Sequence, residues 1–427
     1  MPSGMRGTPV AIDPPPRSAR SNDRAGREAR VRVGLALACL AIAAACSQEA
    51  PPRPDLVLIT VDALPAAALG CFGGPPDAGR ELCAQAEGGT RFAWAVSAAR
   101  GEASAAATVH SGLPPQRHAV DDGGASFLPS RVETIAERLA EAGFRTAAFV
   151  TSPRLNRARR LDQGFEVYED RLAGLADRNA PGALAEAVRN WLARSPGPRF
   201  VWIHLSQTSS LDALDRAVDR IEVAFGDRRR GVLVAALAGA PERPALDWER
   251  HRIPLLWRPP TPGPRDAPGV SFRLTGLEDV RPTLLAAAGL PPRPADDPEI
   301  PVARGRDLGP LARAPRGGEA EDERRILLGG GPSDGAVGLA TASHVYAREP
   351  AAFDGSGSPL PTETLSAHQA RFLPLPLPDP VRHPAPRSAA LRPGPWRRDV
   401  LSSDSPVPSL EFHLARRLAE ERRQEPR

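Results

Sequence analysis

Asp62 is the first residue in this sequence whose side chain is a candidate for catalysis or metal binding. It directly follows Leu-Val-Leu-Ile-Thr-Val (56–61), an apolar run typical of a strand buried on both faces. In sheets built from such strands, ligands bind beyond the carboxyl ends of the strands, so a site is expected in the loop that Asp62 begins. One carboxylate cannot hold a metal ion without further ligands. The sequence has no lysine, which excludes a lysine base or Schiff base.

Histidine and paired acids offer further donor atoms. His204 lies in the apolar run 200–205, where a hydrogen-bonded core histidine is the default expectation. Asp121 and Asp122 are adjacent, so on a strand their side chains would point to opposite faces and could not act together.

Two cysteines, Cys71 and Cys83, follow the last cysteine of the amino-terminal segment. In an oxidising compartment they could pair across a short loop. Two unrelated thiols explain the pattern equally well, so the sequence leaves both interpretations open.

The elements that would position these residues are strands and helices that alternate along the sequence. Apolar runs typical of buried strands recur after the first, at 146–150, 200–205 and 232–237. Helical periodicity lies between them, over 133–143, 182–194 and 212–226. This alternation predicts an α/β fold, a doubly wound and mostly parallel sheet with helices on both faces.

The amino-terminal segment has the pattern of an export signal. An apolar run of 13 residues, 33–45, is too short to span a bilayer and follows three arginines (27, 30 and 32). Ala43-Ala44-Ala45-Cys46 resembles a bacterial lipobox, which predicts Cys46 as the lipidated first residue of a membrane-anchored envelope lipoprotein. Plain secretion and a buried core helix are the alternatives. The Pro-containing stretch 47–54 favours a tether over a fold.

Charge separates this segment from the rest of the chain. Residues 1–46 hold seven arginines and three acids, which is the whole net charge of +4. The remaining chain is neutral, so nucleic acid is not an expected partner.

The boundaries expected from these patterns divide the chain into six parts. Strands are expected at 325–328 and 341–347 of a small C-terminal α+β subdomain, and a charged helix at 410–423 of the tail. The parts are a disordered Arg/Pro-rich leader (1–32), the signal region (33–46), the tether (47–54), the α/β domain (55–314), the C-terminal subdomain with its Pro-rich segment (315–398) and the tail (399–427).

Short motifs follow one another along the chain. They are DLVLITVDALPAAALGCFG (55–73), GTRF (89–92), SGLPPQRHAV (111–120), TIAERLAEAGFRTAAFV (134–150), LDQGFEVYED (161–170), FVWIHL (200–205) and GLEDVRPTLLAAAGL (276–290). In this order they resemble the sulfatase family of the alkaline-phosphatase superfamily. The resemblance covers roughly 55–312 and implies that family's fold.

The resemblance implies a divalent metal held by carboxylates and a His or Asn, beside a nucleophile. Asp62 matches the first metal carboxylate. Glu102 stands at the nucleophile position, and it offers no thiol or hydroxyl. Ser104 is an outside candidate, two positions away and without the neighbouring basic group. Gly239 and Ala240 replace the Asp-His pair of the strongest metal motif.

The remaining matches therefore indicate a degenerate site. Asp62 is the only family ligand left, and it is expected to be vestigial, as a helix N-cap or a solvated loop acid. Glu102 is likewise expected to be a solvated loop acid. Arg117 and His118 match the family's Arg-His pair, where a structural hydrogen bond is favoured over substrate contact. His110 replaces a leucine.

Three functions compete on this basis. A non-catalytic binding or scaffolding protein (a pseudoenzyme) is favoured, with no cofactor and with a basin lined by Ala, Gly and Ser. An active sulfate or phosphate ester hydrolase with a relocated site would need a divalent metal such as calcium and at least three acids or histidines near Asp62. Those candidates are Glu102, Asp121, Asp122, His118 and Asp279.

The third function is an envelope module that binds anionic glycans through a convergent arginine cluster. Its candidates are Arg100, Arg117, Arg131 and Arg154. The expected partners are the membrane, through the lipid at Cys46, and an anionic glycan or a protein.

Overall fold

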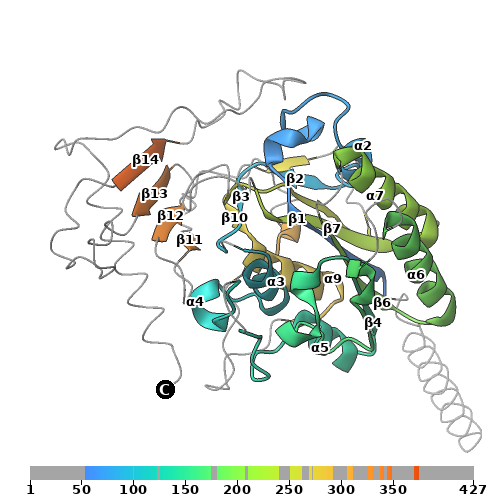
Figure 1. Ribbon diagram of the computed structural model, residues 1–427. Coiled ribbons are helices and arrows are strands. Elements are labelled where there is room, and N and C mark those ends of the chain that lie inside the picture. The colour runs from blue at the N-terminus through green and yellow to red at the C-terminus, as the bar shows by residue number, and fades with distance from the viewer. Residues whose placement is uncertain are drawn as a thin grey trace, which may run out of the picture. The chain divides into compact units, whose positions relative to one another are not determined.

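A computed structural model describes the part of the chain that follows the amino-terminal segment (Figure 1). The described residues are 53–99, 101–122, 126–174, 180–206, 210–239, 251–261, 269–271, 273–291, 305–310, 326–329, 337–340, 344–348 and 370–374. The signal region, Cys46, most of the tether and the C-terminal tail lie outside them.

A β-sheet forms the centre of the main domain (Figure 1). It has eight strands in the order β5-β4-β6-β1-β7-β8-β2-β9. The first five strands in this order are parallel, and β8 is antiparallel to its neighbours β7 and β2. The strands are β1 (Asp55–Ala63), β2 (Thr90–Phe92), β4 (Arg145–Val150), β5 (Val167–Glu169), β6 (Arg199–Leu205), β7 (Arg230–Ala238), β8 (Leu255–Arg258) and β9 (Gly269–Ser271).

Four adjacent strands of this sheet, β4, β6, β1 and β7, are the four that apolar runs predict. Their side chains are almost entirely buried because helices cover both faces of the sheet. β1 lies between β6 and β7, and its register places Thr60 opposite His204. The predicted α/β fold with a mostly parallel sheet is confirmed.

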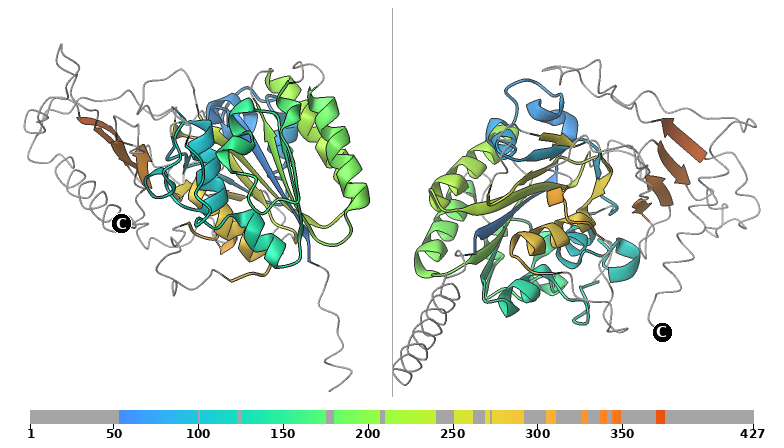
Figure 2. Two further views of the ribbon diagram at one scale, coloured as in Figure 1. Left: turned by 60° about the horizontal axis from the view of Figure 1, so that its bottom comes forward. Right: turned by 180° about the vertical axis from the view of Figure 1, so that it is seen from behind.

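Helices pack on the two faces as separate groups (Figure 2). One face carries α6 (Ala180–Arg194) and α7 (Leu211–Phe225), with α2 (Arg80–Ala84) against α7; the other carries α3 (Glu102–Ser111), α5 (Ile135–Glu141) and α9 (Val280–Ala287). α7 buries Leu214, Val218, Ile221 and Phe225, the face that its periodicity predicts.

Local signals set the helix ends. Thr134 begins α5 with a capping box: its side chain accepts from the backbone of Glu137, whose carboxylate accepts from the backbone of Thr134. Gly143, expected to end this helix, has a positive φ of 85° just after it.

A buried ion pair anchors the amino-terminal ends of two central strands. The guanidinium of Arg199 donates from Nε to Oδ1 of Asp55 (3.1 Å) and from Nη2 to Oδ2 (2.5 Å). Nη1 donates to the backbone oxygens of Leu192 and Ser195. The charges are therefore compensated, as burial requires.

The loop after β1 is closed by a disulfide. Cys71 and Cys83 are bonded, with their Cα atoms 5.8 Å apart, which decides between the two interpretations that the sequence left open. The bond joins η2 (Gly70–Phe72) to α2 and so constrains the segment that leaves the sheet beside Asp62.

Shorter elements complete the described chain. β11 (Ile326–Gly329), β12 (Val337–Ala340), β13 (His344–Arg348) and β14 (Ala370–Pro374) form an antiparallel sheet. β11 and β13 correspond to the strands predicted at 325–328 and 341–347. The others are β3 (Ala95–Val96), β10 (Thr275–Gly276), α4 (Pro115–His118), η1 (Ala66–Ala68), η3 (Pro153–Leu155), η4 (Arg157–Arg159), η5 (Arg171–Gly174) and η6 (Leu277–Asp279).

None of the helices among the described residues is both long and apolar enough to cross a membrane. The predicted signal region is outside that set.

Candidate functional site

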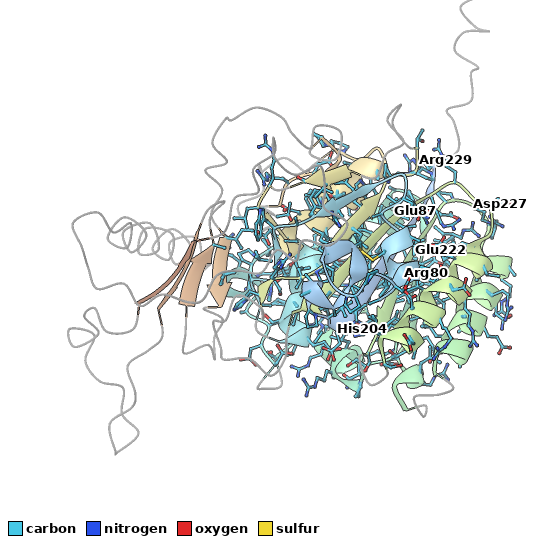
Figure 3. The ribbon with its side chains drawn as sticks, turned by 90° about the horizontal axis from the view of Figure 1, so that it is seen from above. Arg80, Glu87, His204, Glu222, Asp227 and Arg229 are labelled. Carbon is cyan, nitrogen blue, oxygen red and sulfur yellow. A yellow bond between two sulfur atoms is a disulfide. The ribbon has the colours of Figure 1, made fainter. Side chains whose placement is uncertain are left out.

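The candidate site lies at the carboxyl ends of β1 and β6, where α3 begins. β1 contributes Asp62, β6 contributes His204, and α3 contributes its first residue, Glu102. In Figure 3 His204 lies within the outline of the main domain, away from the rim where Asp227 and Arg229 are labelled. This is the end of a parallel sheet at which ligands bind in such folds.

The start of α3 is fixed by a carboxylate from a loop. Asp122 accepts from the backbone N–H of Ala103 (2.7 Å) and of Ser104 (3.4 Å), so it satisfies donors that the first turn of a helix leaves free. Gly101 precedes the helix, and a Cβ there would lie 2.1 Å from Oδ2 of Asp122. A glycine is therefore required for the carboxylate to approach this closely.

Glu102 and His204 face each other inside the protein. Oε1 of Glu102 lies 3.0 Å from Nε2 of His204, and both residues are at most 3% exposed. Neither atom makes a hydrogen bond of good geometry with any described residue, so the contact is a close polar approach rather than a linear hydrogen bond.

Thr60, which Trp202 holds in place, sets the orientation of the His204 ring through a contact at its other nitrogen, Nδ1. Nδ1 lies 2.9 Å from Oγ1 of Thr60, and the indole Nε1–H of Trp202 donates to the same oxygen (2.9 Å). The indole can only donate, so the hydroxyl hydrogen of Thr60 is free to point at Nδ1 of the neutral ring. This arrangement assigns the proton of the neutral imidazole to Nε2, which faces Glu102.

The two carboxyl groups of the site have opposite pKa shifts. Burial alone would raise the pKa of Glu102, but the contacts with His204 and the Ser152 hydroxyl, together with the charge of Arg154, lower it. Burial raises the pKa of Asp62, and the charge of Glu102 raises it further against the opposing effect of His204 and Arg154. Glu102 therefore holds its negative charge more strongly than Asp62 does.

Two sequence-based expectations are wrong at this site. Asp62 is neither a helix N-cap nor a solvated loop acid: β1 continues to Ala63, so Asp62 lies half-buried within the strand. Glu102 is not a solvated loop acid either, because it begins α3 and is buried against His204. The basin is therefore not lined by Ala, Gly and Ser alone, as the non-catalytic interpretation expected.

The structure brings together some of the candidates for a relocated site. Glu102 and Asp122 interact electrostatically with Asp62, and His204 joins them. Burial raises the pKa of Asp122, although the backbone N–H groups that it caps lower it. Asp279 instead accepts from the backbone of Gly276 (2.9 Å) and Arg306 (2.7 Å).

The donor set that the described residues provide does not fit a divalent metal. Within the described ranges, no group of three or more His, Cys, Asp or Glu side chains could hold one. Asp122 is occupied with α3, and Gly239, just after β7, has no side-chain donor. Ala240 lies outside the described residues, and its methyl group offers no donor atom either.

His118 is held in the interior by two hydrogen bonds. Nδ1 accepts from the backbone N–H of Val120 (3.0 Å), and Nε2 lies 3.0 Å from Oγ1 of Thr108. Burial lowers the pKa of His118 to about 3, so the ring is neutral at physiological pH. Ser104 is buried within α3, the helix that Glu102 begins.

His110 is buried without such partners. It lies on α3, with its ring centroid 4.2 Å from that of Trp202 and 5.7 Å from that of Phe165. Both ring nitrogens lack a hydrogen-bond partner among the described residues, and burial lowers the pKa to about 3.

The arginines proposed for glycan binding are placed differently from one another. Arg154 is exposed and acts electrostatically on Asp62 and Glu102. Arg117 is half-buried on α4, and Arg131 is exposed ahead of α5. Arg100 lies outside the described residues.

His204 is the site residue whose role sequence reasoning missed, since it was expected to be an ordinary core histidine. The sequence does contain a pattern that indicates this role. Trp202 and His204 are two residues apart on one strand and so share a face, and Thr60 is a second polar residue within a neighbouring apolar run. Polar residues at the same depth of adjacent strands predict a buried polar network.

Comparison with known proteins supports this fold. Residues 54–229 match the sequence profile of the sulfatase family, described as Sulfatase. No curated protein matches the chain by sequence.

Solved structures resemble the chain over most of its length. A phosphonate monoester hydrolase of Agrobacterium radiobacter is 14% identical with a TM-score of 0.62, covering 87% of this chain and 96% of that one. A 2-O GAG sulfatase is 15% identical with a TM-score of 0.56, covering 69% and 82%. A protein of the alkaline phosphatase superfamily from Vibrio parahaemolyticus is 17% identical with a TM-score of 0.52, covering 76% and 80%. At these identities the likeness concerns the fold.

Proposed function

We propose that this chain, whose residues 54–229 form a sulfatase-family domain, is a non-catalytic binding or scaffolding protein that keeps the fold without the family's chemistry. The observation that carries this proposal is the state of Glu102. By the resemblance of the sequence motifs it corresponds to the family's nucleophile, and its carboxylate is buried against His204. A carboxylate cannot be converted to an aldehyde hydrate and does not attack as an alkoxide.

The missing metal ligands support the same proposal. The family's chemistry would use a divalent ion to polarise the ester and to lower the pKa of the nucleophile. The donor set near Asp62 does not fit such an ion within the described part of the chain.

The amino-terminal sequence supports a location for this protein in the cell envelope. The apolar run 33–45 and the lipobox-like Ala43–Cys46 favour export and a lipid anchor at Cys46. The domain would then act on the periplasmic or the cell-surface side of a bacterial membrane, with an anionic glycan or another envelope protein as its partner.

A second candidate function is hydrolysis of sulfate or phosphate esters by a relocated site. The observation that favours it is the pair of opposite pKa shifts, raised at Asp62 and lowered at Glu102. Neighbouring carboxyl groups with diverging pKa values are a common arrangement of a general acid and a general base.

Ester hydrolysis by the purified chain separates the two functions. Aryl sulfates, phosphate monoesters and phosphate diesters are the substrates, assayed with added calcium, magnesium, manganese or zinc and with a chelator. The non-catalytic function predicts no turnover above a blank of heat-denatured protein. Turnover that Asp62→Asn and Glu102→Gln both abolish, while replacement of the exposed acid at the rim, Asp227→Asn, leaves it intact, would establish the hydrolase instead.

A further inference from the structure

We infer that the carboxylate of Glu102 fills a small oxyanion site built by the surrounding chain, and that this site binds a free monocarboxylate once the Glu102 carboxylate is removed. The inference deepens the proposed function and rests on it, because it explains why the basin of the wild-type protein would not take the sulfate or phosphate group of an ester.

Donors from three separate elements converge on this carboxylate. His204 on β6 presents Nε2 at 3.0 Å, and the hydroxyl of Ser152, at the start of η3, forms a hydrogen bond to it. Glu102 itself begins α3, a helix of ten residues, whose positive end favours an anion. Arg154 adds a positive charge from the exposed side.

The donors are fixed independently of Glu102, so they would stay in place without it. Thr60 and Trp202 hold the His204 ring from behind. Ser152 is 3% exposed and accepts from the backbone N–H of Arg154 (3.3 Å), which orients its hydroxyl. His204 is fully buried, and the proton assigned to Nε2 lies on the side of the ring that faces Glu102, whose Oε1 is 3.0 Å from that nitrogen.

Negative charges around the site set its selectivity. Asp62 and Asp122 both interact electrostatically with Glu102, and the two of them oppose added negative charge. One negative charge replaces the one that is lost, whereas a dianion adds a second. The site should therefore prefer a monocarboxylate to sulfate or phosphate.

The size of the group that Glu102→Ala removes indicates which ligand to test. Glu102→Ala removes the Cγ methylene and the carboxylate, which together have the size of acetate. The variant should bind acetate at one site per chain, about tenfold or more tightly than the wild-type protein does. Sulfate and phosphate should bind it more weakly than acetate.

Isothermal titration of acetate into the full chain tests this, with unfolding temperature recorded at each concentration. Glu102→Gln is the matched control, because its amide fills the same space without a charge and should bind no acetate. Glu102→Ala/Ser152→Ala should bind acetate several-fold more weakly than Glu102→Ala. The inference fails if folded Glu102→Ala binds acetate no more tightly than the wild-type protein, or if Glu102→Gln binds it equally well.

A measurement on the wild-type protein keeps the inference testable if Glu102→Ala does not fold. The Glu102 carboxyl carbon is followed by NMR in protein labelled at the glutamate side chains, and Glu102→Gln assigns its signal. The pH midpoint of the Glu102 titration is expected below 4.5, the ordinary pKa of a glutamate. A titration midpoint at or above 4.5 would overturn the inference. Ester turnover by the wild-type protein would refute the proposed function, yet it would leave acetate binding by Glu102→Ala as a separate result.

Discussion

Replacing His110 with leucine should stabilise the protein, and the gain should grow as the pH falls. His110 is fully buried, and both ring nitrogens lack a hydrogen-bond partner among the described residues. Removing a buried and unsatisfied polar group is worth about 1–3 kcal/mol. Loss of the ring contacts with Trp202 and Phe165 opposes this by about 0.5–1.5 kcal/mol. The net stabilisation expected at pH 7 is about 1 kcal/mol.

The pH dependence follows from the pKa of the buried ring. Burial lowers the pKa of His110 from 6.5 in the unfolded chain to about 3 in the folded protein. Below pH 6.5 the unfolded chain therefore binds a proton that the folded protein does not, and stability is lost as the pH falls from 6.5 towards 3. At pH 5 this costs the wild-type protein about 2 kcal/mol that His110→Leu does not lose.

Urea unfolding at pH 7, 6 and 5 measures the free energy of unfolding of both proteins. The difference should rise from about 1 kcal/mol at pH 7 to about 3 kcal/mol at pH 5. His118→Leu is the matched control, because His118 is equally buried but hydrogen-bonded at both nitrogens. His118→Leu should destabilise the protein at pH 7, and its stability relative to the wild-type protein should rise between pH 7 and pH 5 by the same amount as that of His110→Leu. A stability difference for His110→Leu that does not change between pH 7 and pH 5 would refute the reasoning.

Three further variants test the framework of the fold through its free energy of unfolding. Asp55→Ala leaves the guanidinium of Arg199 buried without its partner and should cost about 3–5 kcal/mol, whereas a cost under about 1 kcal/mol would mean that the pair is hydrated. Replacing Cys71 and Cys83 by serine should cost about 3 kcal/mol, and dithiothreitol should have the same effect on the wild-type protein but none on the variant. Thr134→Ala removes the cap of α5 and should cost about 1 kcal/mol; a neutral effect would argue against the capping box.

The fold could be predicted because its signals are local. The apolar runs at 56–61 and 232–237 are long enough for buried strands, and the 3.6-residue spacing of Leu214, Val218, Ile221 and Phe225 shows which face of α7 is buried. Each signal lies within a few residues of the element that it defines. The strands β12 and β14 were missed because they lie among Gly- and Pro-containing stretches without a clear period.

The site could be predicted only in part because its chemistry depends on contacts between distant segments. The state of Glu102 depends on His204, about one hundred residues later, and on Ser152, which comes from a third segment. Nothing near Glu102 in the sequence predicts that its carboxylate is buried. Asp62 was placed in a loop because the apolar run ends at Val61, yet pairing of Ala63 with Ala238 extends the strand past it.

Metal content tests the central claim most directly. The purified chain is incubated with calcium, magnesium, manganese and zinc, passed through a desalting column, and measured by elemental mass spectrometry. No stoichiometric metal is expected, because the donor set around Asp62 and Glu102 does not fit a divalent ion in the described residues. One tightly bound ion per chain, lost in Asp62→Asn and retained in Asp227→Asn, would contradict this expectation and identify a working metal centre at the carboxyl end of β1.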